Sequence, residues 1–487
     1  MAALKRVIVV VFDGLRPDLV TPELMPNLLR LAARGTWFRE ARSVFPSLTR
    51  VAAASIGTGA AAAHHGIIGN TFLLPAYSDR ATFDSRHLKD ILAAEGAAGG
   101  PMVTAETFAD RLAAAGRRVA IVHTGSAGAT YFLNPRAARH GHWTFSIHGR
   151  DATSTPQAFD EAKAAIGPAT PDRDIPRLGD ARYATDLLIE HVLPRVAPDV
   201  ALIWYSEPDF AFHYTELGSP AARTALQHVD AQFGRILDWV ATQPDADATA
   251  IIAVSDHGHV TTTAQVPVND LLTAAGFPAR EGELGDAVLA TTGGNSGEIR
   301  VRNGDRRAVA RVADWLLRQD FIGMLFSPSR NEVEGEIPGT FGFDLVGLGH
   351  GRAPDLFFIL RSDDGLDHHG LPGRCLFSQS VPLGGGLHGG LNRHELNSLL
   401  MIDAPGLSRA GAVTAATAGI VDVAPTVLGL FGLAPAPTMT GANLLGAESG
   451  SEQAAERHEI GVGAFRQTLT VRRRGEHLFV THGGRSE

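Results

Sequence analysis

The stretch VIVVVFDG at Val7–Gly14 decides the fold class. Its first six residues are apolar and five of them are β-branched, which predicts a strand buried on both faces of a parallel sheet. Asp13 follows where this strand would end, and Gly14 permits a sharp turn there. Alone, Asp13 is more typical of a turn or a helix cap than of a catalytic site, so its meaning depends on the rest of the chain.

Predicted helices and strands alternate downstream of this first strand. The expected helices are Pro26–Arg34, Thr104–Ala115, Asp180–Leu193 and Pro220–Val240, and the expected strands are Val119–His123, Val200–Tyr205 and Thr249–Ser255. Alternation of this kind predicts an α/β fold with a doubly wound, mostly parallel sheet flanked by helices.

The alternation weakens after His259, which suggests an insertion. We interpret residues 1–261 as the first part of the catalytic core and residues 262–351 as an inserted, smaller cap domain that selects the substrate. Residues 352–447 would complete the core, and residues 448–487 would form a C-terminal tail.

The second part of the core and the tail contain further regular elements. We expect the sheet to return at Asp355–Leu360 and at Asn397–Ile402, and a helix to follow at Val421–Phe431. In the tail, Gln467–Val471 and His477–Thr481 are expected to form a hairpin, which could serve a homodimer.

Composition and charge narrow the class of protein. The 487 residues are 44% hydrophobic and 20% charged, with net charge −9 and no dense basic run, which fits a globular protein and excludes extended binding to a nucleic-acid polymer. Cys375 is the one cysteine, so no internal disulfide is possible. We found no signal peptide and no apolar stretch long enough to span a membrane. A cytoplasmic protein without a membrane partner is therefore expected.

A candidate nucleophile stands before an alanine-rich segment. Thr49 ends the sequence FPSLT, and Val51–Gly59 is a good helix former. Thr49 would then lie at a helix N-terminus, where free N–H groups and the helix dipole favour an anion. An ordinary N-cap threonine would have the same pattern.

Acidic and histidine residues follow three other segments. Asp209 and His213 are four residues apart after the strand Val200–Tyr205, so they can face one metal. Asp256 and His257 follow the strand Thr249–Ser255, and His388 stands among glycines that offer it no core to pack into. The following set combines oxygen and nitrogen donors without a thiolate: Asp13, Thr49, Asp209, His213, Asp256, His257 and His388. Such a set suits a pair of zinc ions about 4 Å apart.

The order of these motifs resembles the alkaline phosphatase superfamily. The closest branch is the nucleotide pyrophosphatase/phosphodiesterase group, with its relative phosphonoacetate hydrolase, and the similarity runs from Val7 to about Leu445. The motifs that carry it are Val11–Arg16, Pro46–Thr49, His65–Asn70, Glu207–Asp209 with His213, Asp256–Gly258 and His388–Gly389.

The resemblance implies the metal ligands and the reaction. Asp13, Thr49, Asp256 and His257 would hold one Zn²⁺ ion. The second would be held by Asp209, His213 and His388. Mn²⁺ or another divalent metal is an alternative to zinc. Thr49 would attack phosphorus and form a phospho-threonine, so the implied activity is hydrolysis of a phosphodiester or nucleotide pyrophosphate.

Two residues near Thr49 are candidates for substrate binding. Arg50 follows the nucleophile, and a guanidinium grips phosphate in a bidentate manner. Asn70 closes the His65–Asn70 motif and is the second candidate. Arg50 suggests a small, strongly anionic, phosphorus-containing substrate, unless it faces solvent or pairs with an acid. A phosphonate (C–P) hydrolase or a phosphomonoesterase is therefore the alternative function, and a non-catalytic binding protein on the same fold is the remote one.

Three other features are of lesser weight. Glu207 could orient a neighbouring metal ligand, and His123 could lie just outside the site. Asp367–His369 could bind metal, although a surface loop is the more typical setting for such a polar segment.

Overall fold

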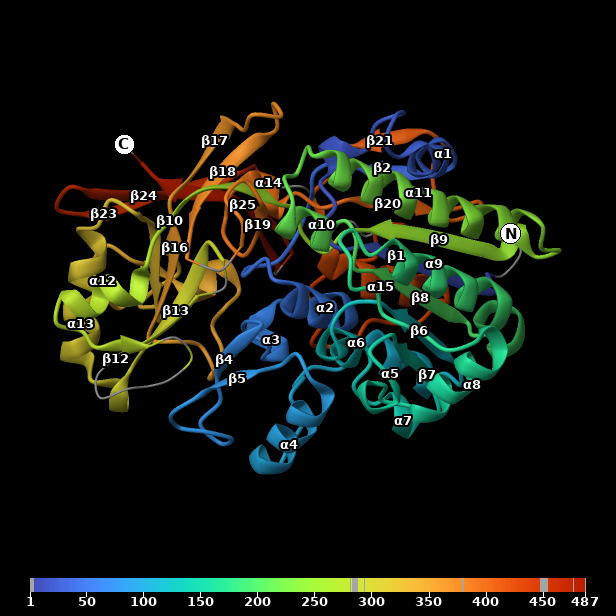
Figure 1. Cartoon of the computed structure of the whole chain (residues 1–487), viewed down its shortest axis with the longest axis horizontal. Helices are drawn as coiled ribbons and strands as arrows, with labels where there is room; N and C mark the ends of the chain where they lie inside the picture. The colour runs from blue at the N-terminus through green and yellow to red at the C-terminus, as the bar shows by residue number, and fades with distance from the viewer. Residues whose placement is uncertain are drawn as a thin grey trace.

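The computed structural model describes residues 4–280, 282, 288–292, 294–378, 381–446, 454–475 and 477–486. Two regions are visible in Figure 1: a large sheet sandwiched between helices on the right, and a second sheet with helices α12 and α13 on the left. The metal-ligand candidates belong to segments that meet between these regions.

The large sheet has eight strands and is mostly parallel. In order across the sheet they are β21 (Ala412–Thr414), β2 (Thr36–Phe38), β20 (Leu400–Asp403), β9 (Thr249–Val254), β1 (Arg6–Phe12), β8 (Val200–Tyr205), β6 (Val119–His123) and β7 (Trp143–Ser146). Strand β1 is central and runs parallel to β8 and β9, whereas β20 runs antiparallel to β9 and β2. The predicted fold class is confirmed.

Alternate residues of β1 face two separate hydrophobic layers. Val7, Val9 and Val11 belong to one buried cluster, and Ile8, Val10 and Phe12 belong to the other. The first layer contains α2 (Thr49–Thr58), α4 (Leu88–Ala98), α5 (Phe108–Ala114), α6 (Ala127–Leu133) and α15 (Val423–Leu430). The second contains α1 (Pro26–Arg34), α8 (Pro156–Ile166), α9 (Leu178–Leu187) and α11 (Pro220–Ala241). Helices on both faces explain why β1 is apolar and buried from Val7 to Phe12.

The second sheet has six strands and its own core. Its order is β11 (Ala279–Arg280), β12 (Val288–Thr292), β13 (Ser296–Val301), β16 (Leu356–Leu360), β14 (Ile322–Ser327) and β15 (Phe341–Gly342). Side chains of α12 (Val268–Ala274) and α13 (Arg306–Leu317) pack on it. The expectation that Asp355–Leu360 returns to the large sheet is wrong, because β16 pairs with β13 and β14 here.

Two smaller sheets complete the fold near the site and the C-terminus. The first contains β17 (Ser362–Leu366), β18 (Pro372–Phe377), β10 (Val260–Gln265) and β19 (Gly386–Leu387). The second contains β23 (Glu456–Val462), β24 (Phe465–Arg474) and β25 (His477–Arg485). The expected tail hairpin is confirmed as β24–β25, with longer strands and a third strand beside it. The turn of this hairpin was expected at Arg472–Glu476, and its last residue, Glu476, lies outside the described residues.

Two helix boundaries differ from the sequence expectation. The helix expected to stop at Leu193 continues from α9 as a π-helix, Leu188–Val196, which contains Pro194. A wider turn near the helix end accommodates a residue without an N–H. The helix expected from Thr104 begins instead at Phe108, because Thr107 caps it by accepting a hydrogen bond from the backbone N–H of Asp110.

The remaining elements are short, and none of the described helices is long and apolar enough to cross a bilayer. They are η1 (Pro17–Leu19), β3 (Ala41–Arg42), α3 (Ala62–His65), β4 (Thr71–Leu73), β5 (Thr82–Asp84), α7 (Ala137–His140), η2 (Arg150–Ala152), α10 (Asp209–Tyr214), η4 (Ala246–Ala248), η5 (Arg302–Gly304), η6 (Phe343–Val346), α14 (Arg393–Leu396), β22 (Ala418–Gly419) and η7 (Ile420–Asp422).

Candidate active site

Three neighbouring strands of the large sheet deliver acidic side chains to one edge. Asp13 directly follows β1, and Asp256 lies two residues beyond β9. Asp209 begins α10, a short helix after β8. These strands are adjacent in the order β9-β1-β8 and run parallel, so their carboxyl ends meet where open α/β sheets bind ligands.

The candidate nucleophile and the remaining histidines join this edge from outside the sheet. Thr49 is the first residue of α2, and its Oγ1 lies 3.2 Å from Nε2 of His257. His388 follows β19, and its Nε2 lies 3.3 Å from Nε2 of His213. The structure thus brings together all seven residues that the sequence proposed as ligands.

The first group of donors surrounds His257. Its Nε2 lies 3.1 Å from Oδ2 of Asp256 and 3.6 Å from Oδ1 of Asp13. The other oxygens are already hydrogen-bonded, since Asp13 Oδ2 accepts from the Trp204 indole and Asp256 Oδ1 accepts from the Gly14 backbone. Asp13 Oδ1 and Asp256 Oδ2 are buried without a hydrogen-bond partner among the described residues. Two free carboxylate oxygens beside an imidazole fit a divalent cation.

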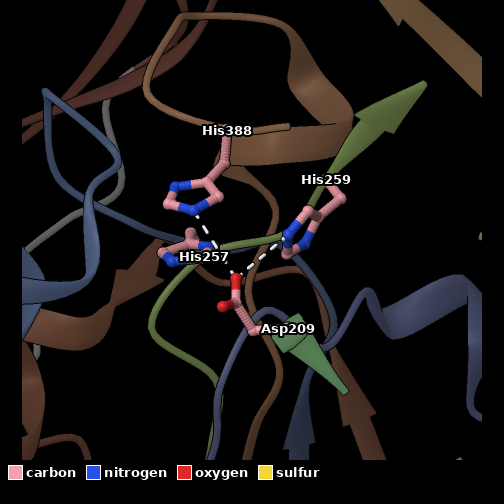
Figure 2. Close-up of side chains that lie close together, drawn as sticks. All are labelled: Asp209, His257, His259 and His388. Carbon is pink, nitrogen blue, oxygen red and sulfur yellow. Dashed lines mark ion pairs between the residues drawn. The ribbon is translucent and has the colours of Figure 1, made fainter. Parts of the chain in front are cut away.

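The second group of donors surrounds one oxygen of Asp209. Asp209 Oδ1 lies 3.1 Å from Nε2 of His259, 3.3 Å from that of His213 and 3.5 Å from that of His388. Figure 2 shows His259 and His388 both pointing at an oxygen of Asp209, each from a different direction. The rings of His257 and His388 stack with centroids 3.6 Å apart, so the two groups of donors are contiguous.

The hydrogen bonds of the histidines favour metal binding. In all four rings Nδ1 faces a backbone carbonyl, which can only accept, so Nδ1 carries the proton and a neutral ring presents a lone pair at Nε2. The carbonyls are Gly386 for His213 at 2.8 Å, Gly258 for His257 at 3.1 Å, Gly14 for His259 at 3.1 Å and Ser47 for His388 at 2.7 Å. Lone pairs that face each other and a carboxylate repel unless cations lie between them, so the residues present fit bound divalent metals.

His259 is the donor that sequence reasoning missed. It lies two residues beyond His257 and is fully buried, with Nε2 unpaired among the described residues. Its ring lies against Gly14, whose φ is +71°, and a Cβ there would be 2.3 Å from His259 Cε1. The signal was present as the pattern Asp-His-Gly-His, in which a second histidine two residues on can reach the same edge.

Burial and neighbouring charges shift the pKa values of the cluster in both directions. Burial lowers the pKa of His213 and of His257, but the carboxylates of Asp209 and Asp256 outweigh burial and raise both pKa values. Burial raises the pKa of Asp13 well above its usual range, and the neighbouring carboxylates of Asp256 and Asp209 raise it further. Burial also lowers the pKa of His388, and the facing rings of His257 and His259 add to this shift. Carboxylates and neutral imidazoles crowded in this way would be relieved by bound cations.

Sequence comparison assigns the chain to a family. Residues 7–363 match the family described as type I phosphodiesterase / nucleotide pyrophosphatase. The chain belongs to this family. Its members form a branch of the alkaline phosphatase superfamily, and the chain is accordingly a phosphoric ester hydrolase of a metal-dependent family that acts on small phosphorus-containing substrates.

Structural comparison agrees on the fold. Murine ectonucleotide pyrophosphatase / phosphodiesterase 5 in an inactive threonine-to-alanine form in complex with AMP matches with a TM-score of 0.61 and 15% identity, covering 89% of this chain and 96% of that chain. Another structure of the same murine protein gives a TM-score of 0.60 at 15% identity, with the same coverage. No curated protein matches the chain.

A cavity of about 740 Å³ opens beside the cluster of candidate metal ligands. Thr49, Asp13, Asp209, His213 and His388 line it together with Arg50 and Asn70. Further lining residues include the cationic Arg86, Lys89 and Arg177, the aromatic Phe210 and Tyr214, and the acidic Asp151. The nucleophile candidate therefore opens onto a space in which positive side chains can meet an anionic substrate.

Arg50 pairs with an acid and also lies on the wall of the cavity. Its guanidinium donates to Asp84 Oδ1 at 2.7 Å, so it does pair with an acid, yet it also lines the cavity. Burial lowers the pKa of Arg50 to about 10 and Asp84 opposes this shift, so the group is cationic at neutral pH. Asn70 Oδ1 accepts a hydrogen bond from the Arg50 backbone at 3.1 Å, which leaves the Asn70 amide N–H groups for other partners.

The lesser candidates lie outside the cluster. Glu207 accepts from the backbone N–H groups of Ala211 and Arg177, so it holds the start of α10. His123 stacks on Trp204 with centroids 5.0 Å apart, and Trp204 in turn donates to Asp13. Both residues therefore act on the ligand candidates through intermediate groups.

Proposed function

We propose that the chain is a two-zinc phosphodiesterase or nucleotide pyrophosphatase that acts through a phospho-threonine intermediate at Thr49. One observation carries this proposal. The Thr49 hydroxyl lies 3.2 Å from Nε2 of His257, at the start of α2 and on the wall of the cavity. A hydroxyl in this position faces both the cation donors and the substrate space.

The donors divide between two cations. Asp13, Thr49, Asp256 and His257 would hold one cation. The Asp209 group would hold the other through His213, His388 and the additional ring of His259. Bound cations would activate the threonine hydroxyl and a water molecule and would neutralise phosphoryl oxygens. Zinc suits this set because imidazole and carboxylate donors predominate.

The residues of the chain define two chemical steps. Oγ1 of Thr49 forms a bond to phosphorus, the bond from phosphorus to the leaving oxygen breaks, and the proton lost by the Thr49 hydroxyl passes to the leaving group. In the second step an oxygen from water attacks the phospho-threonine, the bond between Oγ1 and phosphorus breaks, and Thr49 regains a proton. The N-terminus of α2 favours the anionic phosphoryl group in both steps, and Arg50 and Asn70 provide donors for its oxygens.

The lining of the cavity supports an anionic, nucleotide-like substrate. Arg86, Lys89 and Arg177 add positive charge beyond Arg50, and the guanidinium of Arg177 lies over the ring of Phe210, which also lines the cavity. The murine protein with the matching fold was captured with AMP in an inactive threonine-to-alanine form, which agrees with a threonine-dependent nucleotide site. The same surplus of positive charge favours a second candidate, a phosphonate that bears a carboxylate or a phosphomonoester.

A second cavity adjoins the cluster. Ser296, Gly297 and Glu298 of β13, which lie within residues 262–351 proposed as a cap, and Phe357 of β16, which lies just beyond them, line this cavity of about 160 Å³, and Asn70 and His388 also line it. We therefore propose that the six-stranded sheet helps to select the substrate.

A zinc-loaded activity panel tests the function. Wild-type protein is assayed with a nitrophenyl phosphodiester, the matching monoester and phosphonoacetate, beside Thr49→Ala and Thr49→Ser. We expect diester turnover by the wild type, loss of at least 100-fold in Thr49→Ala and partial retention in Thr49→Ser, whose hydroxyl can still attack. Acid-quenched turnover followed by peptide mass analysis should place phosphate on Thr49.

The panel also separates the alternatives. Cleavage of phosphonoacetate in preference to the diester would transfer the assignment to the carbon–phosphorus hydrolase. Full activity of Thr49→Ala would contradict a threonine nucleophile. Absence of turnover of every substrate by the metal-loaded wild type would favour a non-catalytic binding protein.

A further inference from the structure

We propose that Glu216, His368 and His369 form an additional site for a divalent transition-metal cation such as Zn²⁺, separate from the catalytic cluster. Glu216 Oε2 lies 2.9 Å from Nε2 of His368 and 2.8 Å from Nε2 of His369. The three donor atoms all lie within 4.8 Å of one another. Two imidazoles and one carboxylate, with water in the fourth position, form a set that zinc binds in tetrahedral geometry.

Hydrogen bonds to the Asp367 carboxylate fix the loop that carries the two histidines. Asp367 Oδ1 accepts from the backbone N–H groups of His369 and Leu371, each at 2.9 Å. Asp367 Oδ2 accepts from the Thr261 hydroxyl on β10, also at 2.9 Å. The imidazoles therefore project from a turn whose backbone is fixed on both sides, which lowers the entropic cost of arranging them around an ion.

A glycine on the opposite segment makes room for one ring. A Cβ at Gly218 would lie 2.4 Å from Cβ of His369, so only glycine lets the loop approach the connection between α10 and α11 this closely. Glu216 stands on that connection. His369 is the more sheltered histidine, whereas His368 is exposed, so an ion can enter from solvent and meet two donors already in position.

The position of the cluster gives a bound cation a structural consequence. Glu216 lies three residues beyond His213 and forms a β-bridge with Gly385. The next residue, Gly386, accepts the Nδ1–H of His213, and His388 follows two residues later. A cation bound by Glu216 and the two histidines would therefore join the connection after α10, which already bridges to the segment that carries His388, to the turn between β17 and β18. Occupancy of this site should hold two catalytic ligand candidates in place.

Hydrogen bonding without a metal is the competing explanation. Glu216 burial is slight, and hydrogen bonds from His369 and His368 lower the pKa of its carboxyl, so the three groups can hold together with protons alone. If the three groups bind a metal, the protein holds one additional ion, which is lost when the imidazoles are removed. If they are joined by hydrogen bonds alone, removal of the imidazoles leaves the number of bound ions unchanged.

Metal counting on the full-length protein tests the proposal. The protein is stripped with a chelator, reloaded with Zn²⁺, freed of excess ion and analysed by elemental mass spectrometry. We expect the double variant His368→Ala/His369→Ala and the variant Glu216→Gln each to bind one ion fewer per chain than the wild type. His458→Ala is the matched control, because His458 also lies beside a surface carboxylate, that of Glu456, at 3.6 Å, and it should bind as many ions as the wild type.

A thermal measurement gives an independent readout. The last equivalent of Zn²⁺ should raise the unfolding temperature of the wild type and of the control His458→Ala, but not that of the double variant, because an ion that binds only the folded state stabilises it. Equal zinc content in the wild type and the double variant would overturn the proposal. The difference in zinc content between the variants does not depend on the number of ions that the catalytic cluster binds. A negative result for this additional site would therefore leave the proposed function untouched.

Discussion

Replacement of His259 provides the sharpest test of the metal centre. Its ring is fully buried between two acceptors, with Nδ1 3.1 Å from the Gly14 carbonyl and Nε2 3.1 Å from Oδ1 of Asp209. A neutral ring has one proton, which Nδ1 carries and donates in a hydrogen bond to the Gly14 carbonyl. Nε2 is then left to bind a cation, so His259→Ala should remove a metal donor and a hydrogen bond together.

The two losses have different expected sizes. Removal of a group that only orients a ligand weakens metal binding by about 10–100-fold. Loss of a direct donor should exceed this, so we expect the dissociation constant of one zinc ion to rise by at least about 100-fold, or about 2.7 kcal/mol. The unpaired Gly14 carbonyl should lower the free energy of unfolding of the metal-free protein by about 1–3 kcal/mol.

His259→Asn separates the two effects. Its amide N–H can replace the Nδ1–H and donate to the Gly14 carbonyl, but the side chain has no donor at the position of Nε2. Zinc affinity is measured by competition with a chromophoric chelator, and stability is measured by urea unfolding in the presence of a strong chelator. His259→Asn should keep most of the stability and still lose the affinity. Wild-type affinity in both variants would refute a ligand role for His259.

Three further predictions concern binding, pH and the tail. Arg50→Ala should lower kcat/KM for anionic esters by at least about tenfold in steady-state assays, since a charge-assisted hydrogen bond contributes about 1.5–3 kcal/mol. An unchanged kcat/KM would mean that Arg50 only forms the ion pair with Asp84. Burial lowers the pKa of His123 from 6.5 to about 3, so the stability that its neutral ring contributes is present above pH 6.5 and is lost by about 1.4 kcal/mol per unit as the pH falls toward 3. His123→Asn should flatten the urea-derived stability profile in this range, and an identical profile would contradict a buried neutral ring. Arg474 forms a buried ion pair with Asp422, so Arg474→Ala should cost about 3–5 kcal/mol in thermal and urea unfolding, whereas a loss below 1 kcal/mol would show that the tail is dispensable.

Local pattern was enough to predict most of the large sheet. The run in β1 is apolar at every position because helices cover both faces of the sheet, and β6 and β8 have the bounds that the sequence predicted. The apolar segment Leu356–Leu360 was assigned to the wrong sheet for a physical reason. Burial on both faces makes a strand apolar in any sheet, and its partners are decided by long-range contacts that a local pattern does not contain.

The site was predictable where chemistry coincides with a strand end. Asp13, Asp209 and Asp256 follow three parallel strands, so their convergence follows from the fold class. His388 has no such strand, and the resemblance to a family placed it. For His259 the pattern Asp-His-Gly-His showed only that a second histidine can reach the same edge. Its close approach to Gly14, 245 residues away in the chain, is a long-range contact that spacing does not report.

The backbone sets the chemistry of the cluster before any cation arrives. Each of its four imidazoles faces a carbonyl with Nδ1, and the carbonyls come from four different segments, at Gly14, Ser47, Gly258 and Gly386. Correct folding of these segments selects one tautomer in every ring and directs every Nε2 lone pair toward the same small volume. Rotation of a ring to relieve the repulsion would leave a buried carbonyl without its donor, which costs about as much as a lost hydrogen bond. The protein therefore stores unfavourable contacts among its ligands that bound cations would relieve, and this difference should appear as tight metal binding coupled to stability.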